Sequence, residues 1–130
     1  AAGIITVVTG GNVLPGTNVL AGDLAIKALS GIHFTKVILG ISGASFSHGF
    51  TCETVEEALI YKQLFAISNE IIVVADHTKF GPIGFAHLCQ LEEVHKVVSN
   101  KEMDNKFKEF FFQNKIKVYT PYEVEELVSL

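Results

Sequence analysis

Residues 71–81 read Ile-Ile-Val-Val-Ala-Asp-His-Thr-Lys-Phe-Gly, an apolar run that stops abruptly at an acid. A short run rich in isoleucine and valine is typical of a strand covered on both faces, as in a parallel sheet between helices. Asp76, Thr78 and Lys79 follow the carboxyl end of that strand, where ligands bind in open α/β sheets. Their carboxylate, hydroxyl and ammonium groups suit a polar, anionic small molecule. The alternative interpretation is that Asp76 caps the loop and Lys79 is a solvated surface lysine.

The rest of the chain alternates between strand-like and helix-like patterns. Apolar runs predict strands at 4–8, 36–41, 71–75, 96–99 and 115–119, and the ambiguous pattern at 85–91 favours a further short strand. Helical spacing predicts helices at 23–29, 54–67 and 122–130, and one more that carries Met103, Phe107, Phe110 and Phe111 on one face. Residues 42–52 are expected to form a polar loop. This alternation predicts the α/β class with a mostly parallel sheet.

Local signals mark the ends of two of these helices. Thr54 and Glu57 form the Thr-x-x-Glu capping box that opens a helix. Asn69 is expected to end this helix, and Asn100 to cap the following one. The apolar face of the helix at 54–67 is expected to carry Val55, Ala58, Leu59, Leu64 and Phe65.

Composition limits the classes of protein that fit. The chain has 130 residues, of which 48% are hydrophobic and 18% charged, so it can form one domain with a sizeable core. Its net charge of −4, with ten lysines and no arginine, argues against a nucleic-acid-binding surface on this chain. Cys52 and Cys89 lie far apart, which favours a reduced, cytosolic protein. We find no signal-peptide pattern and no apolar stretch near the roughly 18 residues of a membrane span.

Motifs for common chemistries do not fit this sequence. The segment Gly-Ile-Ser-Gly at 40–43 lacks the G-x-S-x-G spacing of a nucleophile elbow. Ser42, His48 and Asp76 form a triad only if the fold brings them together. There is no G-x-G-x-x-G or P-loop pattern, and the five histidines show no metal-binding spacing. We therefore expect no cofactor and no metal.

Glycines follow three of the predicted strands. They are Gly10 with Gly11, Gly40 with Gly43, and Gly81. If those strands are parallel neighbours, the three loops gather at one edge of the sheet, where glycine lets backbone N–H groups approach a ligand. Lys79 then adds a point charge for a phosphate. The alternative is that each glycine only makes a tight turn.

Taken together, several stretches resemble the effector-sensing domain of the DeoR family of bacterial transcriptional repressors. They occur in the family's order and cover nearly all of residues 4–120. The most specific is Asp-x-x-Lys-Phe-Gly at 76–81, which follows Ala75. The others are Val-Val-Thr-Gly-Gly at 7–11, Gly22, Lys-Val-Ile-Leu-Gly-Ile-Ser-Gly at 36–43, Gly-Phe-Thr at 49–51, and Glu57-Ala58 with Lys62.

The resemblance implies a repressor of carbohydrate metabolism that senses a phosphorylated sugar or a related metabolite. Its fold is expected to be a three-layer, Rossmann-like sheet similar to ribose-phosphate isomerases and coenzyme A transferases. DNA would be bound by an amino-terminal winged helix-turn-helix that these 130 residues do not contain. We expect residues 1–130 to be a partial sensor domain without its first strand and Gly-Thr-Thr loop, and residues 122–130 to form a tail helix. A homo-oligomer is expected, with no membrane partner.

The resemblance also implies roles for individual residues. Lys79 would bind the effector phosphate, and Asp76 would orient it or bind a sugar hydroxyl. The other residues expected at the effector site are Thr78, Gly40, Gly43, Thr51, Gly10 and Gly11. The chain departs from the family pattern at Thr35, where an acid is usual, and at Asn100, where Asp is common.

Two further hypotheses remain open from the sequence. The chain can be read as a sugar-phosphate isomerase or transferase on the same fold, with Asp76 as the base. It can also be read as an oligomerisation fragment that associates through an uncovered sheet edge and helix face, or through residues 122–130.

Overall fold

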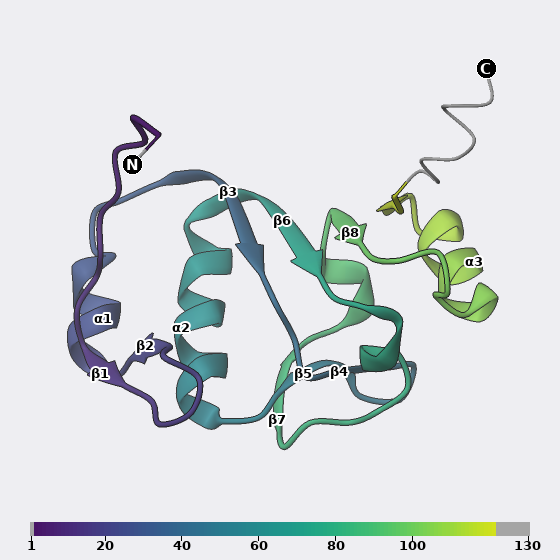
Figure 1. Ribbon diagram of the computed structural model, residues 1–130, viewed down its shortest axis with the longest axis horizontal. Helices are drawn as coiled ribbons and strands as arrows, with labels where there is room; N and C mark the ends of the chain where they lie inside the picture. The colour runs from purple at the N-terminus through teal and green to yellow at the C-terminus, as the bar shows by residue number, and fades with distance from the viewer. Residues whose placement is uncertain (1, 122–130) are drawn as a thin grey trace.

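The computed structural model describes residues 2–121, and Figure 1 shows their arrangement. The main sheet has four parallel strands in the order β3-β6-β8-β9, which are Phe34–Leu39, Ser68–Val74, Lys96–Val98 and Lys117–Tyr119. The second sheet is antiparallel and consists of β4 (Gly43–Ser45), β5 (Gly49–Cys52) and β7 (Ala86–Cys89). The helices are α1 (Asp23–Ala28), α2 (Val55–Ala66) and α3 (Asn105–Gln113), with short turns of 3₁₀ helix at η1 (His77–Lys79) and η2 (Leu91–Glu93). The predicted α/β class and parallel sheet are confirmed.

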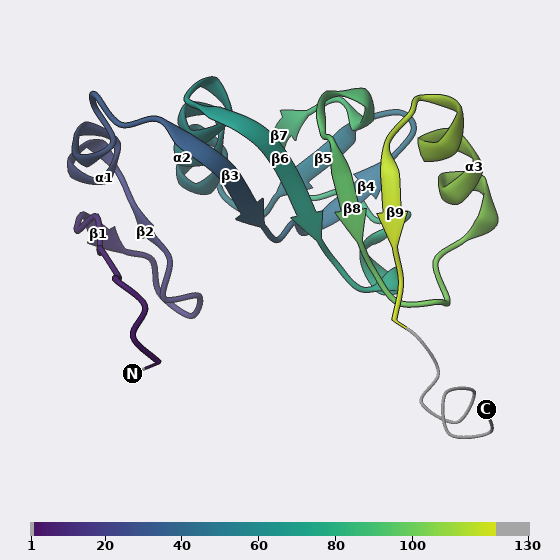
Figure 2. The same cartoon turned by 90° about the horizontal axis from the view of Figure 1, so that it is seen from above.

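Only one face of the parallel sheet is covered within residues 2–121. Figure 2 shows α2, α3 and the second sheet on the same side of the four strands. The side chains on that side are mostly buried, among them Val37, Leu39, Ile71, Val73 and Val97. The strand register places Ile38 beside Ile72, and Val74 beside Val98, which lies beside Tyr119. These five residues, which we call the open face, include Ile38 with 66% of its surface exposed and Val74 with 45%.

The second sheet corrects one expectation. Residues 42–52 were expected to form a polar loop, but they contain the hairpin β4–β5, whose strand residues are all buried. Phe50 and Ala44 are fully buried in the core, and the hydroxyl of Ser45 accepts a hydrogen bond from His48 N at 3.0 Å. Small and hydroxyl-bearing residues are therefore internal here because their polar atoms are satisfied within the hairpin.

The helices follow most of their local signals. Thr54 Oγ1 accepts a hydrogen bond from Glu57 N at 3.1 Å, so Thr54 caps α2 as predicted, and the Thr54 hydroxyl also donates to Glu57 Oε1 at 3.4 Å. The predicted apolar face of α2 is only partly correct, since Leu59 is 52% exposed while Ile60 is buried. Ile60 packs with Ala25 and Leu29 because α2 lies between the sheet and α1. Asn69 does not end this helix and instead lies within β6.

Helix α3 confirms the predicted aromatic stripe. Phe107 and Phe111 are buried in the main core, and Phe110 packs at its edge. The cap of α3 is Asp104, whose carboxylate accepts from Lys106 N at 2.8 Å. The prediction that Asn100 caps this helix is therefore wrong.

The amino-terminal segment also differs from its prediction. Residues 4–8 were expected to form a strand, but they pair with no strand among residues 2–121, and Ile5 is 94% exposed. A strand requires a neighbour for its backbone N–H and C=O groups, and apolar composition alone does not supply one. The strands nearest in sequence are β1 (Asn12–Val13) and β2 (Leu20–Ala21), which form a small hairpin. The tail helix expected at 122–130 lies outside the described residues. No helix between residues 2 and 121 is long and apolar enough to cross a membrane.

Candidate functional site

The loop after β6 is built around the carboxylate of Asp76. Asp76 Oδ1 accepts hydrogen bonds from Thr78 N at 2.8 Å and from the Thr78 hydroxyl, and Asp76 is the cap of η1. These two bonds, with the positive charge of Lys79, hold the pKa of Asp76 below its ordinary value. The carboxylate is therefore ionised at neutral pH. The capping role that the alternative interpretation gave to Asp76 is present in this structure.

Lys79 is half-buried at the end of η1. Within residues 2–121, the structure shows no ion pair for its ammonium group, whereas Lys96 Nζ pairs with Glu70 Oε1 at 3.1 Å. Lys79 is thus partly shielded from solvent, and it forms no ion pair with a carboxylate among residues 2–121. An ammonium group in this condition can bind an anion at low cost, because no existing ion pair has to be broken.

Two of the predicted glycines lie against this loop. Gly81 N donates to Ala44 O at 2.7 Å, and Phe80 forms a β-bridge with Ala44, so the loop docks on β4. A Cβ on Gly43 would lie only 2.3 Å from Pro82 O, so the absence of a side chain there lets the loop approach. A Cβ on Gly40 would have Val74 O as its nearest neighbour, at 3.8 Å. The structure therefore brings Gly40 and Gly43 to the same end of the sheet as Asp76.

Thr51 lies behind this loop rather than at its surface. Its side chain is 2% exposed, and Oγ1 accepts from Gly84 N at 2.7 Å and donates to Gly43 O at 3.2 Å. The hydroxyl therefore ties β5 to β4 and to the turn that follows the loop. Both of its hydrogen-bonding directions are used inside the protein, which leaves it a structural role.

Gly10 and Gly11 do not join the other predicted site residues. They precede β1, and Figures 1 and 2 show β1 at one end of the long axis, well apart from the carboxyl end of β6 where the loop begins. A Cβ on Gly11 would lie 2.6 Å from Ala21 O, so this glycine permits close packing against the β1–β2 hairpin. The expected gathering of three glycine loops required residues 4–8 to be a strand of the parallel sheet, and they are not.

A hollow of about 490 Å³ opens beside Asp76, at the carboxyl ends of β6, β8 and β9. Its lining includes Asp76, Ser99, Asn100 and Tyr119, but not Lys79 or Thr78. Asn100 Oδ1 accepts from His77 N at 2.8 Å, and Asn100 Nδ2 lies 2.7 Å from His77 Nδ1. The sequence prediction missed this contact between the two loops. The signal was available, since Asn100 follows β8 as Asp76 follows β6.

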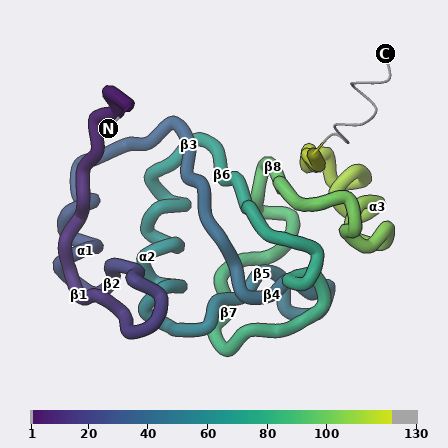
Figure 3. The backbone as a smooth tube through the Cα atoms, viewed as in Figure 1, coloured from purple at the N-terminus to yellow at the C-terminus, as the bar shows by residue number. Residues whose placement is uncertain are grey.

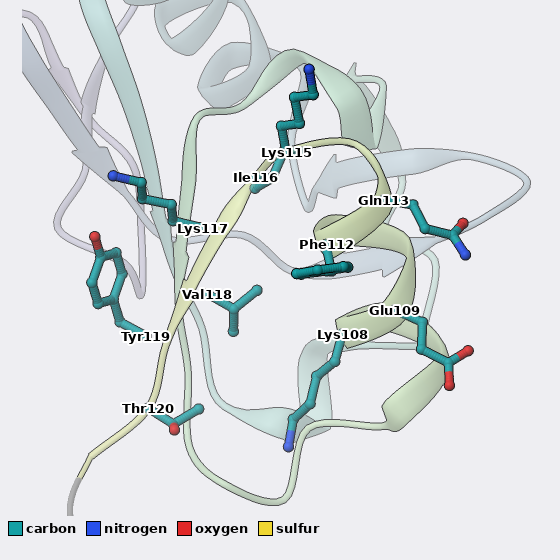
Figure 4. A pocket seen from close by; sticks show the side chains of 10 residues that line it. All are labelled: Lys108, Glu109, Phe112, Gln113, Lys115, Ile116, Lys117, Val118, Tyr119 and Thr120. Atoms are coloured by element: carbon teal, nitrogen blue, oxygen red, sulfur yellow. The ribbon is translucent and has the colours of Figure 1, made fainter.

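A larger groove of about 1090 Å³ lies between α3 and β9. Figure 4 shows the ring of Phe112 and the side chain of Val118 pointing into it from these two elements. None of the predicted site residues lines it. Figure 3 traces the chain from β6 toward α3, and Phe80, which follows η1, packs edge-on against Phe107 of α3 with ring centroids 5.2 Å apart.

The side chains considered from the sequence as a triad have other partners in the structure. The ring of His48 bonds Ser47 Oγ at 2.7 Å and Asp76 bonds Thr78, so the described residues show no Ser42–His48–Asp76 triad. Burial raises the pKa of the Cys52 thiol to about 11 and that of Cys89 to about 12. Both are protonated thiols at neutral pH and therefore poor nucleophiles.

Comparison with known proteins places these features in a family. The chain is 28% identical over 115 residues to the HTH-type transcriptional regulator YulB of Bacillus subtilis, and 25% identical over 116 residues to the HTH-type transcriptional repressor GlcR of the same organism. It is 33% identical over 99 residues to the lactose phosphotransferase system repressor of Staphylococcus aureus. These alignments cover 88%, 89% and 75% of this chain, and 45%, 45% and 38% of the respective relatives. The chain thus spans less than half the length of these relatives.

The family model of the DeoR C-terminal sensor domain matches residues 1–101. This match includes β3, β6, the Asp76–Lys79 loop and Asn100. It ends before α3 and β9. The chain therefore belongs to the family of DeoR C-terminal sensor domains.

Proposed function

We propose that this domain binds a phosphorylated sugar or a related metabolite and regulates a transcriptional repressor of carbohydrate metabolism. Support comes from the family and from two relatives that are named as repressors, one of them of the lactose phosphotransferase system. DNA would be contacted by a helix-turn-helix region of the full-length protein, in the cytoplasm, and not by the residues described here. Effector binding would act by favouring one arrangement of the protein, which requires different affinities for the two arrangements.

The observation that carries the proposal is the half-buried residue Lys79, whose ammonium group has no ion pair among residues 2–121. In the proposed complex Lys79 contacts the phosphate of the effector. Asp76 and Thr78 bind a sugar hydroxyl, and the backbone at Gly40 and Gly43 allows the ligand to approach closely. Gly10, Gly11 and Thr51 take no part, because of the positions described above.

Replacing Lys79 with alanine is expected to weaken binding of the cognate sugar phosphate by roughly 10- to 100-fold. A hydrogen bond to a charged group contributes about 1.5–3 kcal/mol, which corresponds to that change in affinity. The measurement is calorimetric titration of the protein at its full native length with a panel of sugar phosphates and the matching free sugars. Lys62→Ala is the matched control, because Lys62 is exposed on α2. No saturable binding of any sugar phosphate, or equal losses in both variants, would contradict the proposal.

A sugar-phosphate isomerase or transferase fits the same geometry less well. Proton abstraction beside a carbonyl is most effective when the base has a pKa near the working pH. The pKa of Asp76 is lowered by its bonds to Thr78, so the carboxylate is a weaker base than a free one. The relatives are, moreover, transcriptional regulators. Turnover of a sugar phosphate that Asp76→Asn abolishes would favour the enzyme instead.

We also propose that the domain is a homo-oligomer whose contact includes the open face. Parallel sheets are almost always covered on both faces, and three of the five open-face side chains, Ile38, Val74 and Tyr119, are exposed.

Ile38→Glu is expected to shift the 130-residue chain toward the monomer in sedimentation velocity, because a carboxylate would have to be desolvated in the contact. Leu59→Glu introduces the same charge at an exposed apolar residue of α2, on the covered side of the sheet. It is expected to leave the sedimentation profile unchanged. A wild-type chain that stays monomeric at high concentration would contradict this oligomer.

A further inference from the structure

The loop that carries Asp76 and Lys79 is held at its beginning by one side chain from another strand. Asn100, which follows β8, contacts both the backbone and the ring of His77, the first residue of η1. Ser99 Oγ donates a further bond to Asn100 Oδ1 at 3.3 Å. The far end of the loop is held separately, by Gly81 N to Ala44 O and by the packing of Phe80 on Phe107. Lys79 lies between these two attachments.

The geometry of this contact fixes which atom of Asn100 faces which atom of His77. The backbone N–H of His77 can only donate, so the atom 2.8 Å from it must be the amide oxygen. The amide nitrogen then faces His77 Nδ1 at 2.7 Å and donates to it. Nδ1 must therefore carry a lone pair, which places the ring proton of His77 on Nε2. A rotated amide would set two donors against each other at the backbone.

We propose that Asn100 is a positioning residue of the effector site, which rests on the function proposed above. Asp76, His77 and Thr78 are exposed, so packing alone does little to fix this part of the loop. The two bonds from Asn100 fix the position of His77 at the start of η1. The bonds between Asp76 and Thr78 then fix the orientation of η1, and with it the position of Lys79. Asn100 acts on the ligand only through this loop.

The amide satisfies two atoms of His77 at once, which a carboxylate at this position would not do. Asp at position 100 would still accept from His77 N–H, but it has no donor for Nδ1. It would require a proton on His77 Nδ1, which is the opposite of the present pattern. Asn100→Asp therefore separates the bond to the backbone of His77 from the bond to its ring.

The test uses Asn100→Ala and Asn100→Asp, with Asn69→Ala as the matched control. Asn69 also bonds a histidine through its amide oxygen, to His33 Nε2 at 2.8 Å, but it lies at the amino end of β6, away from the loop. Long-range proton–nitrogen NMR spectra distinguish protonated from unprotonated ring nitrogens. We expect an unprotonated Nδ1 in wild-type His77, mixed tautomers in Asn100→Ala and a protonated Nδ1 in Asn100→Asp. Asn69→Ala should resemble the wild type at His77.

The second measurement is titration with inorganic phosphate, followed at the backbone amides of residues 77–81. Asn100→Ala is expected to bind phosphate about three- to tenfold more weakly, and Asn69→Ala like the wild type. A protonated Nδ1 in the wild type overturns the inference. Phosphate affinity and loop amide shifts that Asn100→Ala leaves unchanged also overturn it. If wild-type protein binds no phosphate, the proposed function fails, and the loop amide shifts and ring tautomer of Asn100→Ala then decide the role of Asn100 alone.

Discussion

Replacing Phe111 with alanine is expected to lower the free energy of unfolding by about 3–5 kcal/mol. The side chain is completely buried, and its ring lies 6.4 Å from Phe50, 6.3 Å from Phe80 and 5.9 Å from Phe110, measured between ring centroids. These partners come from β5, from the loop after β6 and from α3. Truncation therefore leaves a cavity where three parts of the core meet, and the surrounding backbone can fill it only partly.

The neighbouring residue provides the control for this prediction. Phe112 follows Phe111 on the same helix, and 83% of its surface is exposed. Phe112→Ala removes the same group and is expected to change stability by less than about 0.5 kcal/mol. Urea unfolding followed by circular dichroism gives both values. Equal losses in the two variants would show that α3 does not pack as described.

Replacing Gly43 with alanine is expected to cost about 3 kcal/mol of stability and to displace the loop from β4. The added methyl group would lie 2.3 Å from Pro82 O and 2.9 Å from Thr51 Oγ1. Pro82 O belongs to the backbone, so the clash cannot be relieved by rotating a side chain. Relief requires the 81–84 turn to move away from β4, which strains the bond from Gly84 N to Thr51 Oγ1 and the bond from Gly81 N to Ala44 O.

Gly40→Ala is the matched control for this substitution. The nearest atom to its added methyl group is Val74 O at 3.8 Å, an ordinary contact, and the residue is exposed. We expect a stability change within about 0.5 kcal/mol. Chemical denaturation compares the two variants, and amide spectra of residues 77–81 report on the loop. A Gly43→Ala protein as stable as Gly40→Ala, with unchanged loop spectra, would refute this packing.

Elements with strong local signals were predicted well from the sequence. The apolar run at 71–75 lies in β6 except for its last residue, the Thr54 cap begins α2, and the spacing of Phe107 and Phe111 marks the buried face of α3. These signals depend on residues within a few positions of each other. The β4–β5 hairpin and the extended residues 4–8 were predicted wrongly, because pairing partners and burial come from distant parts of the chain.

The residues of the candidate site likewise fall into those predicted from local sequence and those that depend on the tertiary structure. Asp76, Thr78 and Lys79 lie within one turn of η1, so their proximity follows from the sequence. Gly40 and Gly43 reach them because β3 and β6 are parallel neighbours in register, which the predicted sheet anticipated. The place of Gly10 and Gly11 depended on a sheet strand that does not form. Asn100 follows β8 as Asp76 follows β6, so the sequence signals a place near the loop, but its contact with His77 depends on β6 and β8 being neighbours.

The central claim is that the loop at 76–81 binds a phosphate-bearing effector through Lys79. The most direct measurement is an amide NMR titration of the full-length protein with glucose 6-phosphate and the other members of the sugar-phosphate panel, each compared with its free sugar. We predict saturable shifts for at least one sugar phosphate at residues 77–81 and 43–44, no shifts at Gly10 and Gly11, and loss of the response in Lys79→Ala. Saturable shifts confined to the groove between α3 and β9, or none with any phosphate, would contradict the claim.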